Sequence, residues 1–355
     1  NILEKFLRSN ASLCYGGTAI NNILPEKDRF YNKDIEIPDY DFFSPNALTY
    51  AKKIADLYYA AGYTEVEAKA GIHSGTYKVY VNFIPIADIT YIDKAIFSKL
   101  LKNAIKVNGI SYCPPDFLRM SMYLELSRPM GDVGRWEKVL KRLVLLNKHH
   151  PLSGDSCSKE KFARKYDGSK ATASDIYNIV RSSVISQGLV FFGGYASGLY
   201  GKYMSAKERK QIVGIPDFDI LSTDAESSAV IIKEQLIHAG YDTVTINKKP
   251  GVGELITAHY EIMITHNNLT DVICYVYNTS SCHSYNNITM DGETLKIASI
   301  DTMLSFYLVF IYIDRPYYDV NRLLCMSEYL FRVQLKNRLE QKGLLKRFSI
   351  ECYGK

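Results

Sequence analysis

The sequence lacks several signals that would assign it to a known compartment or chemistry. Its seven cysteines include no Cys-x-x-Cys pair, so the ligand spacing of a zinc site is absent. An odd number of cysteines without that spacing indicates free thiols in a reducing compartment. No signal peptide is visible. The chain has no starting methionine and opens within a helical pattern, which indicates a fragment of a longer protein.

Long apolar runs and a strong charge imbalance are also absent. The longest apolar run, residues 303–313, is shorter than the roughly 20 residues that a membrane-spanning helix needs. It predicts a buried core helix, and no membrane association is expected. The formal net charge is only +5, so any nucleic-acid-binding surface must be local.

One short motif occurs twice in the chain. Residues 14–19 read Cys-Tyr-Gly-Gly-Thr-Ala, and residues 37–42 then read Ile-Pro-Asp-Tyr-Asp-Phe. Residues 191–196 read Phe-Phe-Gly-Gly-Tyr-Ala, and residues 215–220 read Ile-Pro-Asp-Phe-Asp-Ile. The spacing from glycine pair to acid pair is nearly the same in both copies, which indicates an internal duplication.

The elements around the motif repeat as well. In the first half the patterns predict strands over 13–15, 38–44, 66–70, 76–83 and 84–91, and helices over 18–24, 47–61, 116–127 and 132–146. In the second half they predict strands over 189–192, 216–222, 241–248, 258–265 and 269–277, and helices over 173–186, 196–204, 225–239, 300–313 and 319–339.

Two-residue hairpin turns occupy matching places in the two halves, as Asn108-Gly109 and Asp291-Gly292. We therefore expect a first domain over 1–150 and a second over 173–355. The stretch 151–172 is rich in Ser, Lys, Asp and Gly and is the expected linker.

The acid pair of the motif suggests a metal site. Alternate side chains of a strand face the same way, so Asp39 and Asp41 would project together and repel one another without a cation between them. Hard carboxylate oxygens suit Mg²⁺. Asp88, in the apolar run of the strand 84–91, would supply a third carboxylate, although it could instead be a structural acid paired with Lys78.

The glycine pair suggests a phosphate site. Glycines let the backbone approach a phosphate closely, and a helix beginning at Thr18 would point its free N–H groups at the anion. The Thr18 hydroxyl could add a hydrogen bond. Gly16, Gly17 and Thr18 with the three acids would make a two-metal phosphoryl-transfer site.

These motifs resemble the nucleotidyltransferase superfamily that includes DNA polymerase β. The fuller wording, Cys-Tyr-Gly-Gly-Thr-Ala-Ile-Asn-Asn with Ile-Pro-Asp-Tyr-Asp-Phe-Phe-Ser-Pro-Asn, closely resembles the poly(A) polymerase catalytic subunits of giant, mimivirus-like cytoplasmic DNA viruses. The resemblance covers nearly the whole chain. It implies an α+β fold with two tandem nucleotidyltransferase domains, each a mixed sheet packed with helices.

The resemblance also implies an activity, cofactors and partners. The activity is template-independent addition of AMP from ATP to the 3′ end of mRNA, with Mg²⁺ or Mn²⁺ in a two-metal site. Asp39 and Asp41 would bind both metals, Asp88 would complete the site of the metal that activates the 3′-hydroxyl, and the glycine turn would hold the triphosphate. A homodimer working in the host cytoplasm (viral factory or virion) is implied, and by analogy alone a viral cap methyltransferase that acts as a processivity factor.

The second copy departs from the family at one position. Tyr195 stands where the first copy has Thr18, which removes the short hydroxyl and adds a bulky ring. We therefore expect catalysis in the first copy. The equivalent residues of the second copy are expected to be inactive: Gly193, Gly194, Asp217, Asp219 and Asp271.

The motifs do not specify which RNA accepts the nucleotide or which nucleoside triphosphate is used. Arg135, Lys138, Lys141 and Arg142 recur at near-helical spacing and would contact RNA phosphates or form a solvated face. No residue identifies an adenine pocket. The same motifs would serve a uridylyltransferase or a nucleotidyltransferase acting on tRNA, and a non-catalytic RNA-binding scaffold is the alternative from another class.

Overall fold

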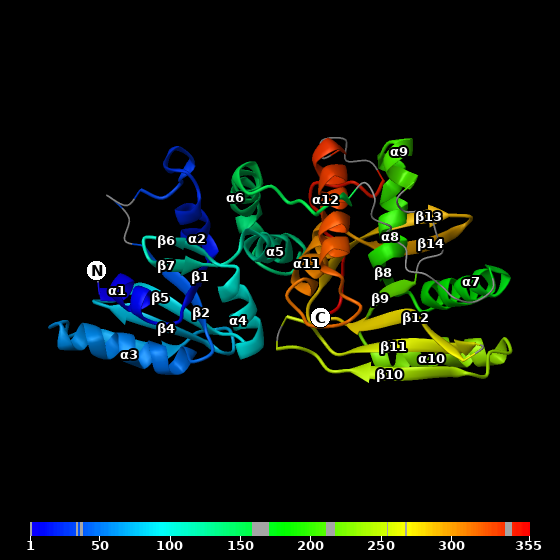
Figure 1. The fold of residues 1–355 in the computed structure, drawn as a ribbon, viewed down its shortest axis with the longest axis horizontal. Helices are drawn as coiled ribbons and strands as arrows, with labels where there is room; N and C mark the ends of the chain where they lie inside the picture. The colour runs from blue at the N-terminus through cyan, green and yellow to red at the C-terminus, as the bar shows by residue number, and fades with distance from the viewer. Residues whose placement is uncertain are drawn as a thin grey trace. The chain divides into compact units, whose positions relative to one another are not determined.

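The computed structural model describes residues 2–32, 35, 38–157, 170–210, 217–253, 255–266, 268–337 and 343–355 (Figure 1). It forms two compact units. Unit 1 comprises Asn1–Arg119 and Lys141–Pro151, and unit 2 comprises Met120–Leu140 and Leu152–Lys355. This division differs from the expected domains because 120–140 count with unit 2. Most of the expected linker lies outside the described residues.

Unit 1 is built on a seven-stranded mixed sheet in the order β3-β4-β5-β2-β1-β7-β6 (Figure 1). Its strands are β1 Leu13–Tyr15, β2 Tyr40–Ser44, β3 Val66–Ala70, β4 Thr76–Val81, β5 Ile84–Tyr91, β6 Ile105–Val107 and β7 Ile110–Tyr112. The helices of this part of the chain are α1 Ile2–Ser9, α2 Gly16–Ile23, η1 Glu26–Asp28, α3 Ala47–Ala60, α4 Lys94–Lys102, α5 Pro115–Leu126, η2 Val133–Arg135 and α6 Trp136–His149. The chain passes between the two units within α5 and α6.

The two faces of β2 have different surroundings. Tyr40 and Phe42 are buried, and the Tyr40 hydroxyl donates a hydrogen bond to the Glu4 carboxylate of α1. Because side chains alternate along a strand, Asp41 and Phe43 point to the opposite face, where Phe43 packs edge-on against Phe117 of α5. One face of the sheet is therefore a packed core, and the other carries the acid.

Unit 2 repeats this topology. Its sheet order is β10-β11-β12-β9-β8-β14-β13-β15 (Figure 1). The strands are β8 Val190–Phe192, β9 Phe218–Ser222, β10 Val244–Lys249, β11 His259–His266, β12 Leu269–Asn278, β13 His283–Met290, β14 Glu293–Ala298 and β15 Cys352–Tyr353. The helices are α7 Lys170–Ser186, α8 Gly193–Tyr200, η4 Gly201–Tyr203, α9 Ala206–Arg209, α10 Ala225–His238, α11 Ile300–Phe310 and α12 Val320–Asn337.

The duplication is confirmed by strand pairing. In unit 1, β1 lies antiparallel to β2 and parallel to β7, and β2 lies parallel to β5. In unit 2, β8 lies antiparallel to β9 and parallel to β14, and β9 lies parallel to β12. Both predicted hairpin turns are present, with φ of 51° and 77° at Asn108-Gly109 and of 51° and 81° at Asp291-Gly292. These positive values are those of a tight hairpin turn.

The apolar run 303–313 behaves as predicted. Every residue of α11 is buried, so the run forms a core helix. No helix within the described ranges combines the length and the apolarity needed to cross a membrane.

The cysteines differ from expectation. Cys157 is disulfide-bonded to Cys325, and Cys282 to Cys352, so the prediction of free thiols is wrong for these four. The partners are 168 and 70 residues apart in the sequence, yet folding brings their Cα atoms to 5.3 and 5.1 Å, within the range that a disulfide requires. No local spacing indicates such pairs. The free cysteines of the described chain are buried: Cys14, Cys113 and Cys274.

Two buried histidines make the stability of unit 2 dependent on pH. Burial lowers the pKa of His259 and of His283 to about 4, against about 6.5 in an unfolded chain. As the pH falls from 6.5 to 4, the unfolded chain takes up protons that the folded chain does not. We expect the free energy of unfolding to decrease over this window by about 3 kcal/mol per histidine, and to show no such loss above pH 6.5. Urea unfolding at pH 7.0 and pH 4.5 measures the change.

A double variant isolates the contribution of these two side chains. His259→Phe with His283→Phe removes both titrating rings and should flatten the stability profile between pH 7.0 and 4.5. His238, which is exposed on α10, is the control, because His238→Gln should leave the profile as it is. An unchanged slope in the double variant would contradict the assignment.

Candidate functional site

The candidate site lies at the centre of the unit 1 sheet, where four side chains form a row across adjacent strands. Asp41 is paired with Tyr15 of β1 on one side and with Asp88 of β5 on the other. Asp88 is paired in turn with Lys78 of β4. Directly paired residues share a face of the sheet. Asp41 and Asp88 are therefore lateral neighbours on strands about 5 Å apart.

Asp39 reaches the site in a different way from the one expected. The predicted strand began at residue 38, but β2 begins at Tyr40, so Asp39 precedes the strand. The Thr18 hydroxyl of α2 donates a hydrogen bond of 2.6 Å to the Asp39 backbone carbonyl. The hydroxyl that was expected to bind phosphate is thus used to position an acid.

The acids are close enough to influence one another electrostatically. Burial raises the pKa of Asp39, and the negative charge of Asp88 raises it further, while Lys78 acts in the opposite direction. For Lys78, burial would lower the pKa, but the hydrogen bond to Asp88 and its charge outweigh burial and raise it. The carboxylates therefore stabilise the positively charged form of Lys78.

Gly16 allows Asp41 to approach the turn. Its φ of +72° is one that L side chains rarely adopt, and a Cβ at this position would lie 2.5 Å from Asp41 Oδ2. Helix α2 begins at Gly16 itself, and its N-cap Tyr15 makes no side-chain capping bond. The N-cap side chain therefore does not cover the first turn of α2, and the N-terminus of a helix favours an anion.

Asp88 has one satisfied and one unsatisfied oxygen. Oδ2 accepts a hydrogen bond from the Lys78 ammonium group, so the predicted structural pairing is present. Oδ1 is buried without a hydrogen-bond partner. Such an atom costs about 1–3 kcal/mol unless a ligand satisfies it.

These observations test whether the residues suit a divalent metal. In the described part of the chain, no three His, Cys, Asp or Glu side chains are gathered closely enough to form a metal cluster as they stand. The donors are nonetheless hard carboxylates. Asp41 and Asp88 lie on two neighbouring strands, and Asp39 directly precedes the strand of Asp41. Asp88 Oδ1 is buried without a hydrogen-bond partner. This donor set fits Mg²⁺ or Mn²⁺ in chemical type.

The second copy keeps the turn but not the third acid. Gly193 has φ +66°, and a Cβ there would lie 1.9 Å from Asp219 Oδ2. Asp219 is paired with Phe192 on one side and with Tyr275 on the other. Tyr275 therefore occupies the position that Asp88 has in unit 1.

The expected match between Asp271 and Asp88 is wrong. Asp271 is paired with Ile264 of β11 and lies four residues before Tyr275 along β12, or about 13 Å at the rise of a strand. The hairpin of β11 and β12 is longer than that of β4 and β5, so counting residues from the acid pair did not give the register.

The remaining parts of the second copy are largely buried. Asp217 and Asp219 are 9% and 8% exposed. The Tyr195 ring packs against Phe191 and Phe218, and its hydroxyl accepts a hydrogen bond from Arg181 Nε. Gly194 follows Gly193 in α8. The ring that replaces Thr18 is thus a member of an aromatic cluster.

The predicted basic residues do not share one environment. Lys138 and Lys141 on α6 are exposed, as is Arg135 of η2, which pairs with Glu125 at 3.1 Å. Arg142 is buried, with 8% of its surface exposed. It does not belong to a solvated stripe, and its contacts lie in unit 1 beside the glycine turn.

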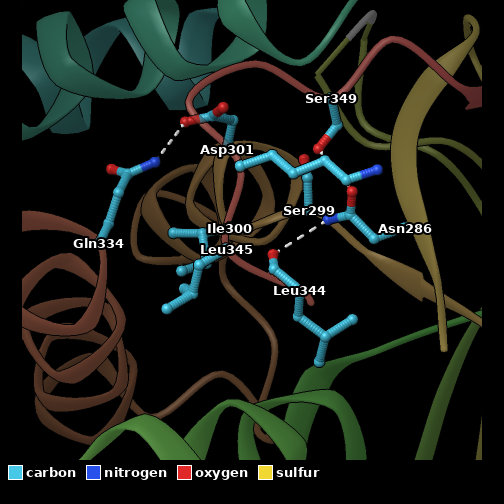
Figure 2. Close-up of a pocket in the computed structure, with 9 residues that line it drawn as sticks. Asn286, Ser299, Ile300, Asp301, Gln334, Leu344, Leu345 and Ser349 are labelled. Atoms are coloured by element: carbon cyan, nitrogen blue, oxygen red, sulfur yellow. Dashed lines mark hydrogen bonds between the residues drawn. The ribbon is translucent and has the colours of Figure 1, made fainter. Parts of the chain in front are cut away.

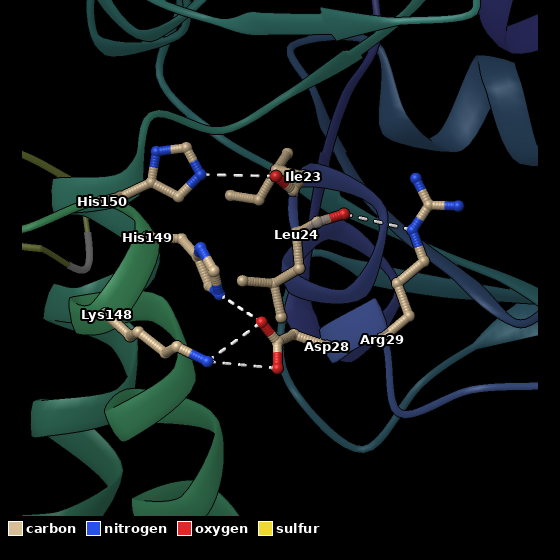
Figure 3. A network of polar contacts seen from close by, with 7 residues as sticks. All are labelled: Ile23, Leu24, Asp28, Arg29, Lys148, His149 and His150. Atoms are coloured by element: carbon tan, nitrogen blue, oxygen red, sulfur yellow. Dashed lines mark hydrogen bonds and ion pairs between the residues drawn. The ribbon is translucent and has the colours of Figure 1, made fainter. Parts of the chain in front are cut away.

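Asp28, in the segment between α2 and β2, contacts the C-terminal end of α6. Asp28 accepts hydrogen bonds from the Lys148 ammonium group at 3.2 and 3.3 Å and contacts His149 Nε2 at 2.6 Å (Figure 3). These contacts, that of Lys148 first, lower the pKa of Asp28. His150 Nε2 lies 3.3 Å from the Ile23 carbonyl (Figure 3). Sequence reasoning did not anticipate this attachment.

A small pocket in unit 2 contains none of the predicted site residues. In it the Gln334 amide donates to the Asp301 carboxylate at 2.9 Å, and the Asn286 amide donates to the Leu344 carbonyl at 3.2 Å (Figure 2). Ser349 donates to Asn286 Oδ1. The pocket is lined by Asn286, Ser299, Ile300, Asp301, Gln334, Leu344, Leu345, Lys346 and Ser349. None of the glycines and acids of either motif lines this pocket.

Comparisons with known proteins agree with this description of unit 1. The sequence model of the family described as poly(A) polymerase catalytic subunit matches residues 1–132. This segment contains the first glycine turn and all three of its acids, and it ends before the second copy. The match therefore concerns the first copy of the motif and its surroundings.

Individual relatives come from large DNA viruses. The predicted poly(A) polymerase catalytic subunit of Acanthamoeba polyphaga mimivirus is 31% identical over 155 residues, which is 42% of this chain and 26% of that protein. A predicted poly(A) polymerase catalytic subunit of African swine fever virus is 30% identical over 157 residues, 42% of this chain and 33% of that protein. The chain thus spans between a quarter and a third of the length of these relatives.

A solved structure matches the whole fold. The crystal structure of the Megavirus polyadenylate synthase superposes with a TM-score of 0.81 and 20% sequence identity, covering 100% of this chain and 73% of that one. At 20% sequence identity, the structural likeness establishes the fold alone. The predicted α+β fold with two tandem mixed-sheet domains is confirmed. The predicted resemblance to the poly(A) polymerase catalytic subunits of mimivirus-like viruses is confirmed as well, but the sequence matches cover residues 1–132 and 42% of the chain, and only the structural likeness covers all of it.

Proposed function

We propose that unit 1 is the catalytic domain of a template-independent polynucleotide adenylyltransferase, which transfers AMP from ATP to the 3′ end of mRNA. The observation that carries the proposal is the placement of Asp41 beside Asp88 and against Gly16, within the segment that matches the polymerase family. Two adjacent carboxylates at an anion-binding turn suit phosphoryl transfer better than any other reaction class.

Each residue has a part in this mechanism. Asp39, Asp41 and Asp88 would hold the divalent ions, Mg²⁺ or Mn²⁺. When bound, such ions neutralise phosphate charge and make a hydroxyl a better nucleophile. The backbone of Gly16 and Gly17 binds the triphosphate, while Thr18 holds the Asp39 carbonyl. The RNA 3′-oxygen forms a bond to the α-phosphorus of ATP, the bond to the β-phosphate oxygen breaks, and pyrophosphate leaves.

The second unit would not catalyse this reaction. Its acid pair has Tyr275 where the first copy has Asp88, so no acid stands at the register position of Asp88. Unit 2 would instead serve as a structural domain or an RNA platform, and exposed Arg135, Lys138 and Lys141 are the candidates for RNA phosphate contacts.

The setting of the reaction follows from the resemblance. The proposed assembly is a homodimer that acts on RNA in the host cytoplasm, in a viral factory or virion. The word subunit in the names of the relatives is compatible with a further partner, such as a viral cap methyltransferase that increases processivity.

Incorporation of each nucleoside triphosphate onto a short labelled RNA primer tests the proposal. With Mg²⁺ or Mn²⁺, we expect ATP to be incorporated at least about tenfold faster than UTP, CTP or GTP, because this ratio needs only about 1.4 kcal/mol of discrimination. Preference for UTP, or for a tRNA acceptor, would replace adenylyl transfer by the corresponding activity. No incorporation by folded protein would favour a non-catalytic RNA-binding scaffold.

A further inference from the structure

Arg142 lies directly over the glycine turn. A Cβ placed on Gly17 would lie 2.9 Å from Arg142 Nη1, 3.0 Å from Nη2 and 2.6 Å from the Tyr31 hydroxyl. The guanidinium group is therefore about one methyl group away from the backbone of the proposed phosphate-binding turn. It comes from α6, more than 120 residues later in the sequence, so the turn and the cation are brought together by the fold.

The position of this guanidinium group is well determined by its neighbours. Arg142 Nη2 donates a hydrogen bond of 2.6 Å to the Tyr31 hydroxyl, and the group lies over the Phe30 ring at 4.9 Å. The backbone N–H groups of Phe30 and Tyr31 both donate to Asn21 Oδ1, at 2.8 and 2.9 Å. Asn21 is on α2 itself, and the Asp28 contacts hold the same loop to α6 (Figure 3).

Arg142 forms no ion pair with a carboxylate among the described residues. Only 8% of the Arg142 surface is exposed. The guanidinium group contacts the Tyr31 hydroxyl and the rings of Phe30 and Tyr31, and none of these partners is a carboxylate. A buried cation is costly unless it is paired with an anion. The first turn of α2 is where an anion would be held, because the N-terminus of a helix favours negative charge.

We propose that Arg142, oriented by Tyr31, binds the triphosphate of the incoming nucleotide at the Gly17 turn, and does not contact the RNA backbone. The proposal deepens the proposed function, on which the identity of the anion as ATP rests. A planar guanidinium fork matches two phosphate oxygens. In the ligand-free protein, the cation–π and hydroxyl contacts hold the fork ready for this anion.

Calorimetric titration with inorganic tripolyphosphate, with ATP and with a short single-stranded RNA tests the proposal. We expect Arg142→Gln to weaken tripolyphosphate and ATP about 10- to 100-fold, the loss of one or two charge-assisted hydrogen bonds, while RNA affinity changes less than about twofold. Arg142→Lys, which keeps the charge but not the fork, should fall between the two proteins. Lys102→Gln on α4 is the matched control, because it removes one exposed positive charge from another helix of unit 1.

The outcomes are separable. Weakened RNA with unchanged tripolyphosphate would overturn the proposal in favour of an RNA contact. Unchanged affinities for all three ligands, or no tripolyphosphate binding by the wild type, would overturn it in favour of a structural role. If Arg142→Gln fails to fold, Arg142→Lys alone decides. An affinity of Arg142→Lys for tripolyphosphate equal to that of the wild type would overturn the proposal, and a partial loss of that affinity would support it. The protein could also bind tripolyphosphate through Arg142 and yet incorporate no nucleotide. That result would support the anion site and contradict the proposed adenylyltransferase activity.

Discussion

Replacement of Asp41 by Asn is expected to lower nucleotide transfer at least about 10³-fold, because it removes one of the two adjacent carboxylates at the anion-binding turn. Asp41 is paired with Asp88 across β2 and β5 and approaches the Gly16 backbone. Asparagine has nearly the same shape, so the packing of the strand should persist. The measurement is single-turnover incorporation of AMP onto an RNA primer, with thermal unfolding as the check of folding.

The duplication supplies a matched control. Asp219→Asn makes the same change beside the same kind of glycine turn, but next to Tyr275 in place of an acid. We expect this variant to transfer AMP within about twofold of the wild type. If Asp219→Asn were inactive and Asp41→Asn active, the catalytic domain would be unit 2, and the adenylyltransferase itself would stand.

Replacement of Gly16 by Ala is expected to lower transfer about 100-fold while the protein remains folded. An alanine there must adopt φ +72° and place its Cβ 2.5 Å from Asp41 Oδ2. The left-handed conformation costs roughly 1–3 kcal/mol, and the contact displaces the carboxylate from its place beside Asp88. A displacement of about 1 Å in a catalytic group is enough for a loss of this size.

Two other glycines separate strain from catalysis. Gly193→Ala introduces the same conformation and an even closer contact, at 1.9 Å from Asp219 Oδ2, so we expect it to lower stability without lowering transfer per folded molecule. Gly62 has φ +95° with nothing within 4 Å of a Cβ, so Gly62→Ala should show the conformational cost alone. Wild-type transfer by Gly16→Ala would contradict the role of this close approach.

Much of the site could be predicted because its parts are local in sequence. The glycine turn, the hairpin at Asn108-Gly109 and the strand carrying Asp88 each follow from a few adjacent residues. Helix α4 was not predicted, although Asp93 caps it by accepting from the N–H groups of Ala95 and Ile96. This capping signal was present in the sequence.

The errors occurred where a position depends on pairing between distant strands. Asp271 was expected to match Asp88, but the register of the longer β11–β12 hairpin places Tyr275 at that position. Asp39 was expected on a strand, but its placement depends on a hydrogen bond from Thr18. Neither contact leaves a periodic signal in the sequence.

By itself the amino-acid sequence determined the duplication, the class of fold and the residue types of the site, since turns, strand alternation and helix periodicity are properties of short segments. The tertiary structure alone decided that only the first copy has a third acid in register, that Arg142 is buried over Gly17, and that four cysteines are paired. The physical reason is that each of these depends on the meeting of residues tens to hundreds of positions apart, which is fixed by sheet register and core packing.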